Sequence, residues 1–319
     1  LPADTSGFAV FADPWAYDPR FTVRALPSLE DYGTELLPAN RTLVWFDGGN
    51  YETDARCRSD LAGNQLVHDA NYDVFVTRAE SSGAGHGLGG RATVDQLAQY
   101  EDLVYTSANR SYNTLAYGDF QEDPSRDVQV LDAWLRLGGR DAFLTGDDLA
   151  GELSWRAPET QAFLQTWLGV DVTSTELRPL IDNQTAPRVL PTDATVFETT
   201  DAWTAYGGCL AINTFDAVTP RTNAVRVAEF CDYVGNPGAY PYAAATLAVD
   251  QATGSRVVLL PYDLGYVYAD QDTWYRPPGA SAAQCVLRDV GNHLGFIHIH
   301  TDVPEHGDPA VFAARHYPN

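Results

Sequence analysis

Short, continuous apolar runs rich in β-branched and aromatic residues recur along the chain, each ending at turn residues. They span residues 42–46, 72–77, 103–106, 142–145 and 256–260. Strands that are apolar along their whole length are typical of a parallel sheet that is buried on both faces. The pattern therefore predicts a mostly parallel sheet.

Helical patterns separate these runs. Apolar residues recur at helical spacing over 128–137, around 163–168 and over 282–294, and the first of these helices is expected to end at Gly138-Gly139. Strands alternating with helices predict a doubly wound α/β fold, whose ligands usually bind at the carboxyl ends of the strands.

The rest of the chain divides into three further parts. Residues 1–40 are rich in proline and aromatics without periodicity, and we expect an irregular N-terminal arm. Within the α/β domain of residues 41–297, residues 171–250 carry short strand-like runs and predict a β-rich insertion or extension. Residues 298–319 are expected to form a tail or linker.

The amino-acid composition and net charge exclude some classes of binding partner. The chain has 43 acidic and 20 basic residues, a net charge of −23, and every basic residue is arginine. Such a field repels phosphate backbones and anionic lipids, so nucleic acid is not an expected partner. No apolar run approaches the roughly 20 residues of a membrane-spanning helix. Protein partners, copies of the chain itself and glycans are left as candidates.

The cysteines and the first residue bear on the compartment. Leu1 in place of methionine suggests that a leader has been removed. An even number of cysteines without a CxxC pair suits two disulfides in an oxidising compartment, and we favour Cys209–Cys231 with Cys57–Cys285. Buried thiols are the alternative. Sequons at Asn40, Asn109 and Asn183 count as glycosylation sites only where the organism has the machinery.

Four segments, at 43–52, 100–109, 131–153 and 254–267, together resemble the class I glutamine amidotransferase-like superfamily, and most closely its secreted branch. The resemblance implies a flavodoxin-like fold. Active amidotransferases place a cysteine nucleophile in a Gly-x-Cys-x-Gly elbow, where this chain has Asp148. Pro261-Tyr262-Asp263 stands where a His-x-Glu would follow the late strand. The amidotransferase reaction is therefore not expected.

The last six residues, Ala314 to Asn319, resemble the start of a C-terminal secretion or sorting module of secreted bacterial proteins. This resemblance implies a secreted, extracellular or cell-surface location. It also implies that a further C-terminal module follows in the precursor.

Carboxylates gather at the predicted carboxyl edge of the sheet: Asp47, Glu52, Asp147, Asp148 and Asp263. Paired carboxylates can share a proton and act as acid and base. Alternatively, Asp47, Asp147 and Asp148 could bind a divalent cation such as Ca²⁺ or Mg²⁺. The structural interpretation is that Asp147 and Asp148 cap the helix that follows.

Histidines give two further candidate sites. His86 lies in a glycine-rich loop and could form a hydrolytic triad with Ser107 and a carboxylate, although no Gly-x-Ser-x-Gly elbow supports it and a solvated loop histidine is the alternative. The second cluster has the spacing of a Zn²⁺ site, or is a local accident of sequence, and comprises His298, His300, Asp302 and His306. A divalent metal is the one cofactor that these clusters suggest.

Aromatic residues form the last candidate group. Tyrosine and tryptophan at this density can stack on sugars or anchor a protein interface, or can simply pack in the core. The group comprises Tyr233, Tyr240, Tyr242, Tyr262, Tyr266, Tyr268, Trp274 and Tyr275.

These features favour a non-catalytic secreted or cell-surface module that binds a partner or assembles with itself. The alternative is an extracellular hydrolase, metal-dependent or not, that uses Asp147 and Asp148 with or without His86. A structural subunit of an extracellular layer or filament is a third interpretation, and it predicts strand-edge contacts between copies.

Overall fold

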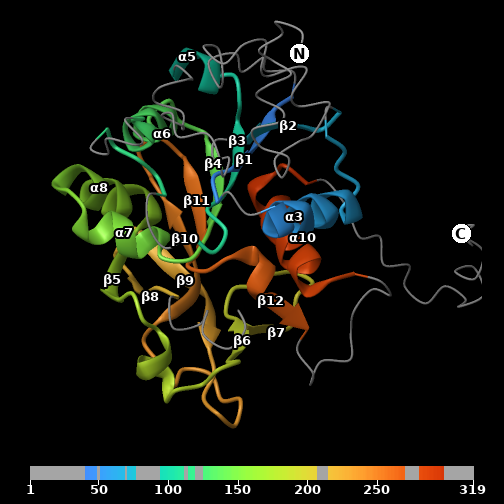
Figure 1. Cartoon of the computed structure of the whole chain (residues 1–319), viewed down its shortest axis with the longest axis vertical. Coiled ribbons are helices and arrows are strands. Elements are labelled where there is room, and N and C mark those ends of the chain that lie inside the picture. The colour runs from blue at the N-terminus through green and yellow to red at the C-terminus, as the bar shows by residue number, and fades with distance from the viewer. Residues whose placement is uncertain are drawn as a thin grey trace, which may run out of the picture.

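The computed structural model describes residues 40–48, 51–68, 70–76, 94–110, 114–118, 125–206, 215–269 and 280–297. These residues form an α/β fold with one sheet of twelve strands, some parallel and some antiparallel, and with helices packed around it (Figure 1). The predicted arm, except Asn40, and the predicted tail lie outside the described residues.

Five parallel strands form one half of the sheet, in the order β2-β1-β3-β4-β11. Their bounds are β1 Thr42–Phe46, β2 Tyr72–Val76, β3 Asp102–Thr106, β4 Asp141–Thr145 and β11 Arg256–Leu260. This strand order is the one found in flavodoxin-like sheets, with β11 as the fifth strand. The four strands β1 to β4 are buried along their whole length, which explains their continuous apolar sequences.

Helices cover the parallel strands on both faces (Figure 1). Phe46 and Phe143 pack in one core with α3 and α10, whereas Trp45 and Tyr105 pack in the other with α6 and α8. The helical segments are α3 Tyr51–Gly63, α5 Val94–Leu97, α6 Asp127–Leu135, α7 Leu149–Trp155, α8 Pro158–Phe163, η1 Leu164–Leu168, η2 Arg178–Ile181, η4 Leu264–Tyr266 and α10 Ala282–Leu294. None of the helices in the described part of the chain has the length and apolarity needed to cross a bilayer.

Seven antiparallel strands extend the sheet beyond β11, so the prediction of a mostly parallel sheet is correct only for its first half. They are β5 Val170–Ser174, β6 Arg188–Pro191, β7 Trp203–Ala205, β8 Ala217–Pro220, β9 Ala224–Phe230, β10 Ala243–Val249 and β12 Val267–Ala269. The order β11-β10-β9-β6-β7-β12 continues the same sheet, and β8 pairs with β10 and β5. The predicted β-rich insertion is therefore a continuation of the central sheet.

The expected Cys57–Cys285 disulfide is not formed. Cys57 on α3 is a buried thiol, and no disulfide joins any two of the described cysteines, Cys57, Cys231 and Cys285. Burial, followed by the nearby carboxylates of Asp60 and Asp54, raises the pKa of the Cys57 thiol far above its usual value. The thiol is therefore protonated and unreactive. Cys209 lies outside the described residues, so Cys209–Cys231 stays a prediction.

Two of the three sequons have their asparagine side chains in use. The Asn40 amide donates to Asp73 Oδ1 over 2.7 Å, and Asn109 is hydrogen-bonded to Tyr266. Asn183 is exposed in a left-handed turn with φ 58°. Of the three, Asn183 is the best placed to carry a glycan.

Candidate functional site

The carboxyl edge of the parallel strands brings together most of the predicted carboxylates, because β1, β3, β4 and β11 all end there. The hydrogen-bond ladder continues past the strands: Ser107 N donates to Thr145 O over 3.0 Å and Asp47 N to Thr106 O over 2.9 Å. Asp47 is fully buried, and its Oδ2 accepts a 2.9 Å hydrogen bond from the Tyr105 hydroxyl. The side chain of Glu52 lies outside the described residues.

Asp147 and Asp263 lie side by side at this edge. The backbone N–H of Asp263 donates to Asp147 Oδ1 over 3.2 Å, and that of Gly265 donates to Asp263 Oδ1 over 3.0 Å. Burial, and then the charge of Asp263, raise the pKa of Asp147 well above its usual value. Burial raises the pKa of Asp263 to about 6, against the backbone hydrogen bond from Gly265. Both carboxyls hold neighbouring turns in place.

Asp148 occupies the elbow between β4 and α7 in a left-handed backbone conformation, with φ 50° and ψ 10°. Such a conformation is uncommon for a residue other than glycine and often marks a functional turn. Burial, followed by the nearby Glu152 and Glu176, raises the pKa of Asp148 to about 7. A carboxyl that titrates near neutral pH can serve as a general acid or base.

The expected capping of α7 by Asp148 is not formed. Asp148 stands at the N-cap position, but its side chain makes no capping hydrogen bond. Asp216, in the segment before β8, accepts instead from Gly151 N over 2.8 Å. Because the elbow is left-handed, this distant carboxyl caps the helix in place of Asp148. Burial raises the pKa of Asp216 well above its usual value. Sequence reasoning missed Asp216, since 65 residues separate it from Gly151.

Ser107 is fully buried at the end of β3, and its Oγ has no hydrogen-bond partner within the described structure. The hydroxyl points at Gly146, where an added Cβ would overlap it. It therefore faces the β4 elbow. The proposed partner His86 lies outside the described residues.

No metal centre is formed by the described residues. Among them, no group of three or more His, Cys, Asp or Glu side chains is arranged to hold an ion, so Asp47, Asp147 and Asp148 do not converge as a ligand set. The alternative cluster falls outside the described chain altogether: His298, His300, Asp302 and His306.

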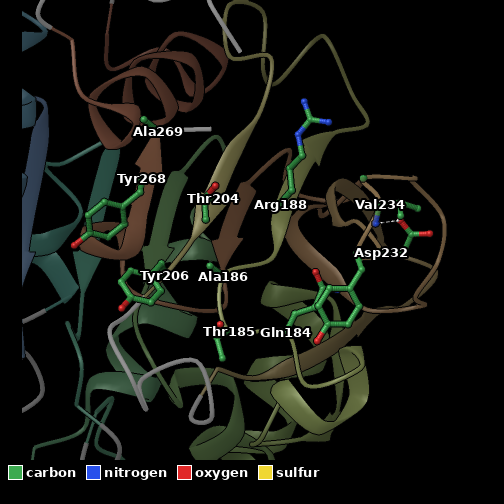
Figure 2. A pocket seen from close by; sticks show the side chains of 12 residues that line it. Gln184, Thr185, Ala186, Arg188, Thr204, Tyr206, Asp232, Val234, Tyr268 and Ala269 are labelled. Atoms are coloured by element: carbon green, nitrogen blue, oxygen red, sulfur yellow. Dashed lines mark hydrogen bonds between the residues drawn. The ribbon is translucent and has the colours of Figure 1, made fainter. Parts of the chain in front are cut away.

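A pocket of about 810 Å³ lies at the far end of the sheet, on β6, β7 and β12 and the turn 232–235. In Figure 2, Tyr206 and Tyr268 line one side of it, and Asp232 and Val234 line the other. Apart from its tyrosines, this pocket could not be predicted from the sequence, because antiparallel pairing brings its walls together from distant segments.

The predicted aromatic group is divided by the structure. Tyr233 and Tyr268 line the pocket and are 67% and 42% exposed. Tyr262 is a fully buried core residue, and Tyr240, Tyr242 and Tyr266 are partly buried against the same core. Trp274 and Tyr275 lie outside the described residues.

No known protein family and no curated protein sequence matches the chain. Solved structures with a similar arrangement include a ThuA-like protein from Parabacteroides merdae, at 9% identity and a TM-score of 0.45, covering 80% of this chain and 90% of that chain. A ThuA-like protein from Bacteroides uniformis has 8% identity and a TM-score of 0.42, covering 81% of this chain and 91% of that one. The glutaminase domain of CTPS from Trypanosoma brucei has 10% identity and a TM-score of 0.42, covering 81% and 95%.

Proposed function

We propose that this chain is a non-catalytic binding module that contacts its partner through the pocket on β6, β7 and β12. One observation carries the proposal: three carboxylates near the sheet's carboxyl edge, Asp147, Asp263 and Asp216, accept hydrogen bonds from the backbone. Asp147 accepts from the Asp263 N–H, Asp263 from Gly265, and Asp216 from Gly151. A carboxylate that is buried and bonded in this way is poorly placed to meet a substrate.

The pocket supports the binding half of the proposal. Its volume of about 810 Å³ falls in the usual range of ligand sites, and exposed tyrosines line it. Tyrosine is also enriched at protein interfaces, where its ring supplies rigid contact area. A secreted or cell-surface location and self-assembly stay predictions from the sequence.

The experiment is a search for turnover with a matched variant. Wild type and Asp148→Asn are assayed with chromogenic acetyl, carboxyl-ester, glycoside and peptide substrates. We expect no turnover from either protein. Turnover in the wild type that Asp148→Asn abolishes, with the melting temperature unchanged, would contradict the proposal.

The second candidate function, a hydrolase, is favoured by Asp148 itself. It combines the elbow position, a left-handed backbone and a pKa of about 7. In this candidate Asp148 acts as a general base towards water, and the rate would rise with pH and reach half its maximum near pH 7. The same assay repeated between pH 5 and 9 tests it.

A further inference from the structure

We propose that the pocket on β6, β7 and β12 binds a neutral oligosaccharide, which stacks on Tyr268 and Tyr233. The inference rests on the proposed binding function and names its ligand. It is carried by the aromatic faces, the polar side chains and the charge balance of the pocket.

Aromatic faces line the pocket from three different segments. The rings of Tyr206 and Tyr268 meet edge to face, with centroids 5.9 Å apart and planes at 70°. The Tyr233 hydroxyl donates to Asp182 O over 2.8 Å, which fixes a ring that is otherwise exposed. Rigid, exposed rings are suited to stacking against the apolar C–H faces of pyranose rings at little cost in side-chain entropy.

Polar side chains complete the lining, together with the aliphatic Ala186, Val234 and Ala269. Arg188, Thr185 and Thr204 belong to it, and Figure 2 places Arg188 and Thr204 between the two sides. An arginine side chain can donate to a hydroxyl oxygen, and threonine hydroxyls both donate and accept. A ligand rich in hydroxyl groups matches this lining better than an apolar peptide does.

The charge of the pocket favours a neutral ligand. Arg188 and Asp232 are its charged lining residues, one of each sign. The Asp232 carboxylate already accepts from the N–H groups of Val234 over 3.0 Å and Asn236 over 2.7 Å, so it is committed to the turn. The chain as a whole carries −23, which repels anionic sugars.

Calorimetric titration tests the proposal on the full chain. The probes are cellohexaose, mannohexaose, maltohexaose and N-acetylchitohexaose, with hexagalacturonate and a proline-rich decapeptide as the anionic and peptide comparators. We expect one or more neutral hexasaccharides to bind with a Kd below about 1 mM. Their affinity should hardly change between 0.05 and about 0.5 M salt, because no net charge is neutralised.

Variants locate the binding. Tyr268→Ala and Tyr233→Ala should each weaken the bound hexasaccharide about 10-fold, whereas Tyr268→Phe, which keeps the ring, should stay within about 3-fold. Trp155→Ala is the matched control, since Trp155 is 68% exposed on α7 and outside the pocket lining. Circular dichroism and melting temperature confirm that each variant is folded.

Three results would overturn the inference: no neutral hexasaccharide binds, hexagalacturonate or the peptide binds more tightly, or the tyrosine variants match Trp155→Ala. If the peptide binds through Tyr268, the sugar is wrong but the binding function survives. If turnover depends on Asp148, the proposed function fails whatever the titrations give.

Discussion

At the scale of single residues, Asp216 takes a role that the local sequence assigns to Asp147 and Asp148. It accepts from Gly151 N at the start of α7 while Asp148 makes no capping bond. Asp216→Ala should lower the free energy of unfolding by about 1–2 kcal/mol, because the helix loses its acceptor. Urea denaturation measures the loss.

The amide variant is the control for this cap. Burial raises the pKa of the Asp216 carboxyl well above its usual value, which favours its uncharged form. Asp216→Asn retains a carbonyl oxygen for Gly151 N and should cost less than half as much as Asp216→Ala. Equal losses in the two variants would show that packing, and not the hydrogen bond, is what Asp216 supplies.

Asp263 predicts how stability changes with pH. Its pKa is about 6 in the folded chain against 3.8 for an aspartate exposed to water, so between these values the folded state holds more protons than the unfolded state. The contribution of Asp263 to the free energy of unfolding is therefore fully present below pH 4 and is lost as the pH rises through 6. The difference between these two pKa values corresponds to about 3 kcal/mol in the free energy of unfolding. Asp148, with a pKa of about 7, extends the fall towards neutral pH.

The test compares urea midpoints at pH 4.5 and 7.5. Wild type should be more stable at pH 4.5, and Asp263→Asn should reduce that difference because the amide cannot ionise. Asp193→Asn is the control: the Asp193 pKa is lowered by hydrogen bonds from Thr195, so this carboxyl stays ionised at both pH values. A pH dependence that Asp263→Asn leaves unchanged would place the titrating group elsewhere.

At the scale of elements, the strands of the parallel half were predictable from sequence and α3 was not. β1 and β11 have the predicted bounds because a strand buried on both faces must be apolar throughout. The helix α3 and the residue after it bury polar groups: Asp60 Oδ1 accepts from the Ser281 hydroxyl over 2.7 Å, and the Asn64 amide, just past the helix, donates to Gln284 O over 2.9 Å. A helix held by polar contacts to α10 shows no apolar periodicity.

The candidate site, like the fold, was predictable from the sequence only in part. Strand ends placed Asp147 and Asp263 at one edge correctly, since parallel strands align their carboxyl ends. Asp216 and the pocket depend on antiparallel pairing between distant segments, and nothing local in the sequence fixes that pairing. Of the residues that line the pocket, the sequence predicts only Tyr233 and Tyr268 as binding candidates, within a larger aromatic group.

Arg256, at the start of β11, connects this strand to β4 and to the end of α10. It forms a bidentate pair with Asp141 on β4, over 2.8 and 2.6 Å, and donates to the carbonyls of His293 and Leu294 at the end of α10. Arg256→Ala should lower the free energy of unfolding by roughly 2–3 kcal/mol. Guanidinium chloride denaturation provides the measurement.

An exposed pair provides the comparison. Arg136 also binds an aspartate in a two-bond fork, Asp132, but its own side chain is 62% exposed. Arg136→Ala should cost less than about 0.5 kcal/mol, because solvent screens the pair. If the two arginines cost the same, the carbonyls of α10 contribute nothing to the binding of Arg256.

At the scale of the whole molecule, the antiparallel extension shares one core with the parallel half. Trp203 on β7 donates to the Tyr262 hydroxyl over 3.0 Å, and the Tyr262 ring stacks on Phe215 at 4.8 Å. The same cluster contains Phe46 and Phe143 of the parallel strands. A sheet and a core that run through both halves couple their stabilities, so neither half should unfold alone.

Thermal unfolding tests this coupling. Far-UV circular dichroism and tryptophan fluorescence should give one shared transition, with calorimetric and van't Hoff enthalpies equal. Trp203→Ala, which removes a fully buried ring, should lower the free energy of unfolding by about 3–5 kcal/mol and move that single transition as a whole. Two transitions in the wild type, of which Trp203→Ala shifts one, would show that the extension folds as a separate unit. The pocket would then belong to a body independent of the β4 elbow.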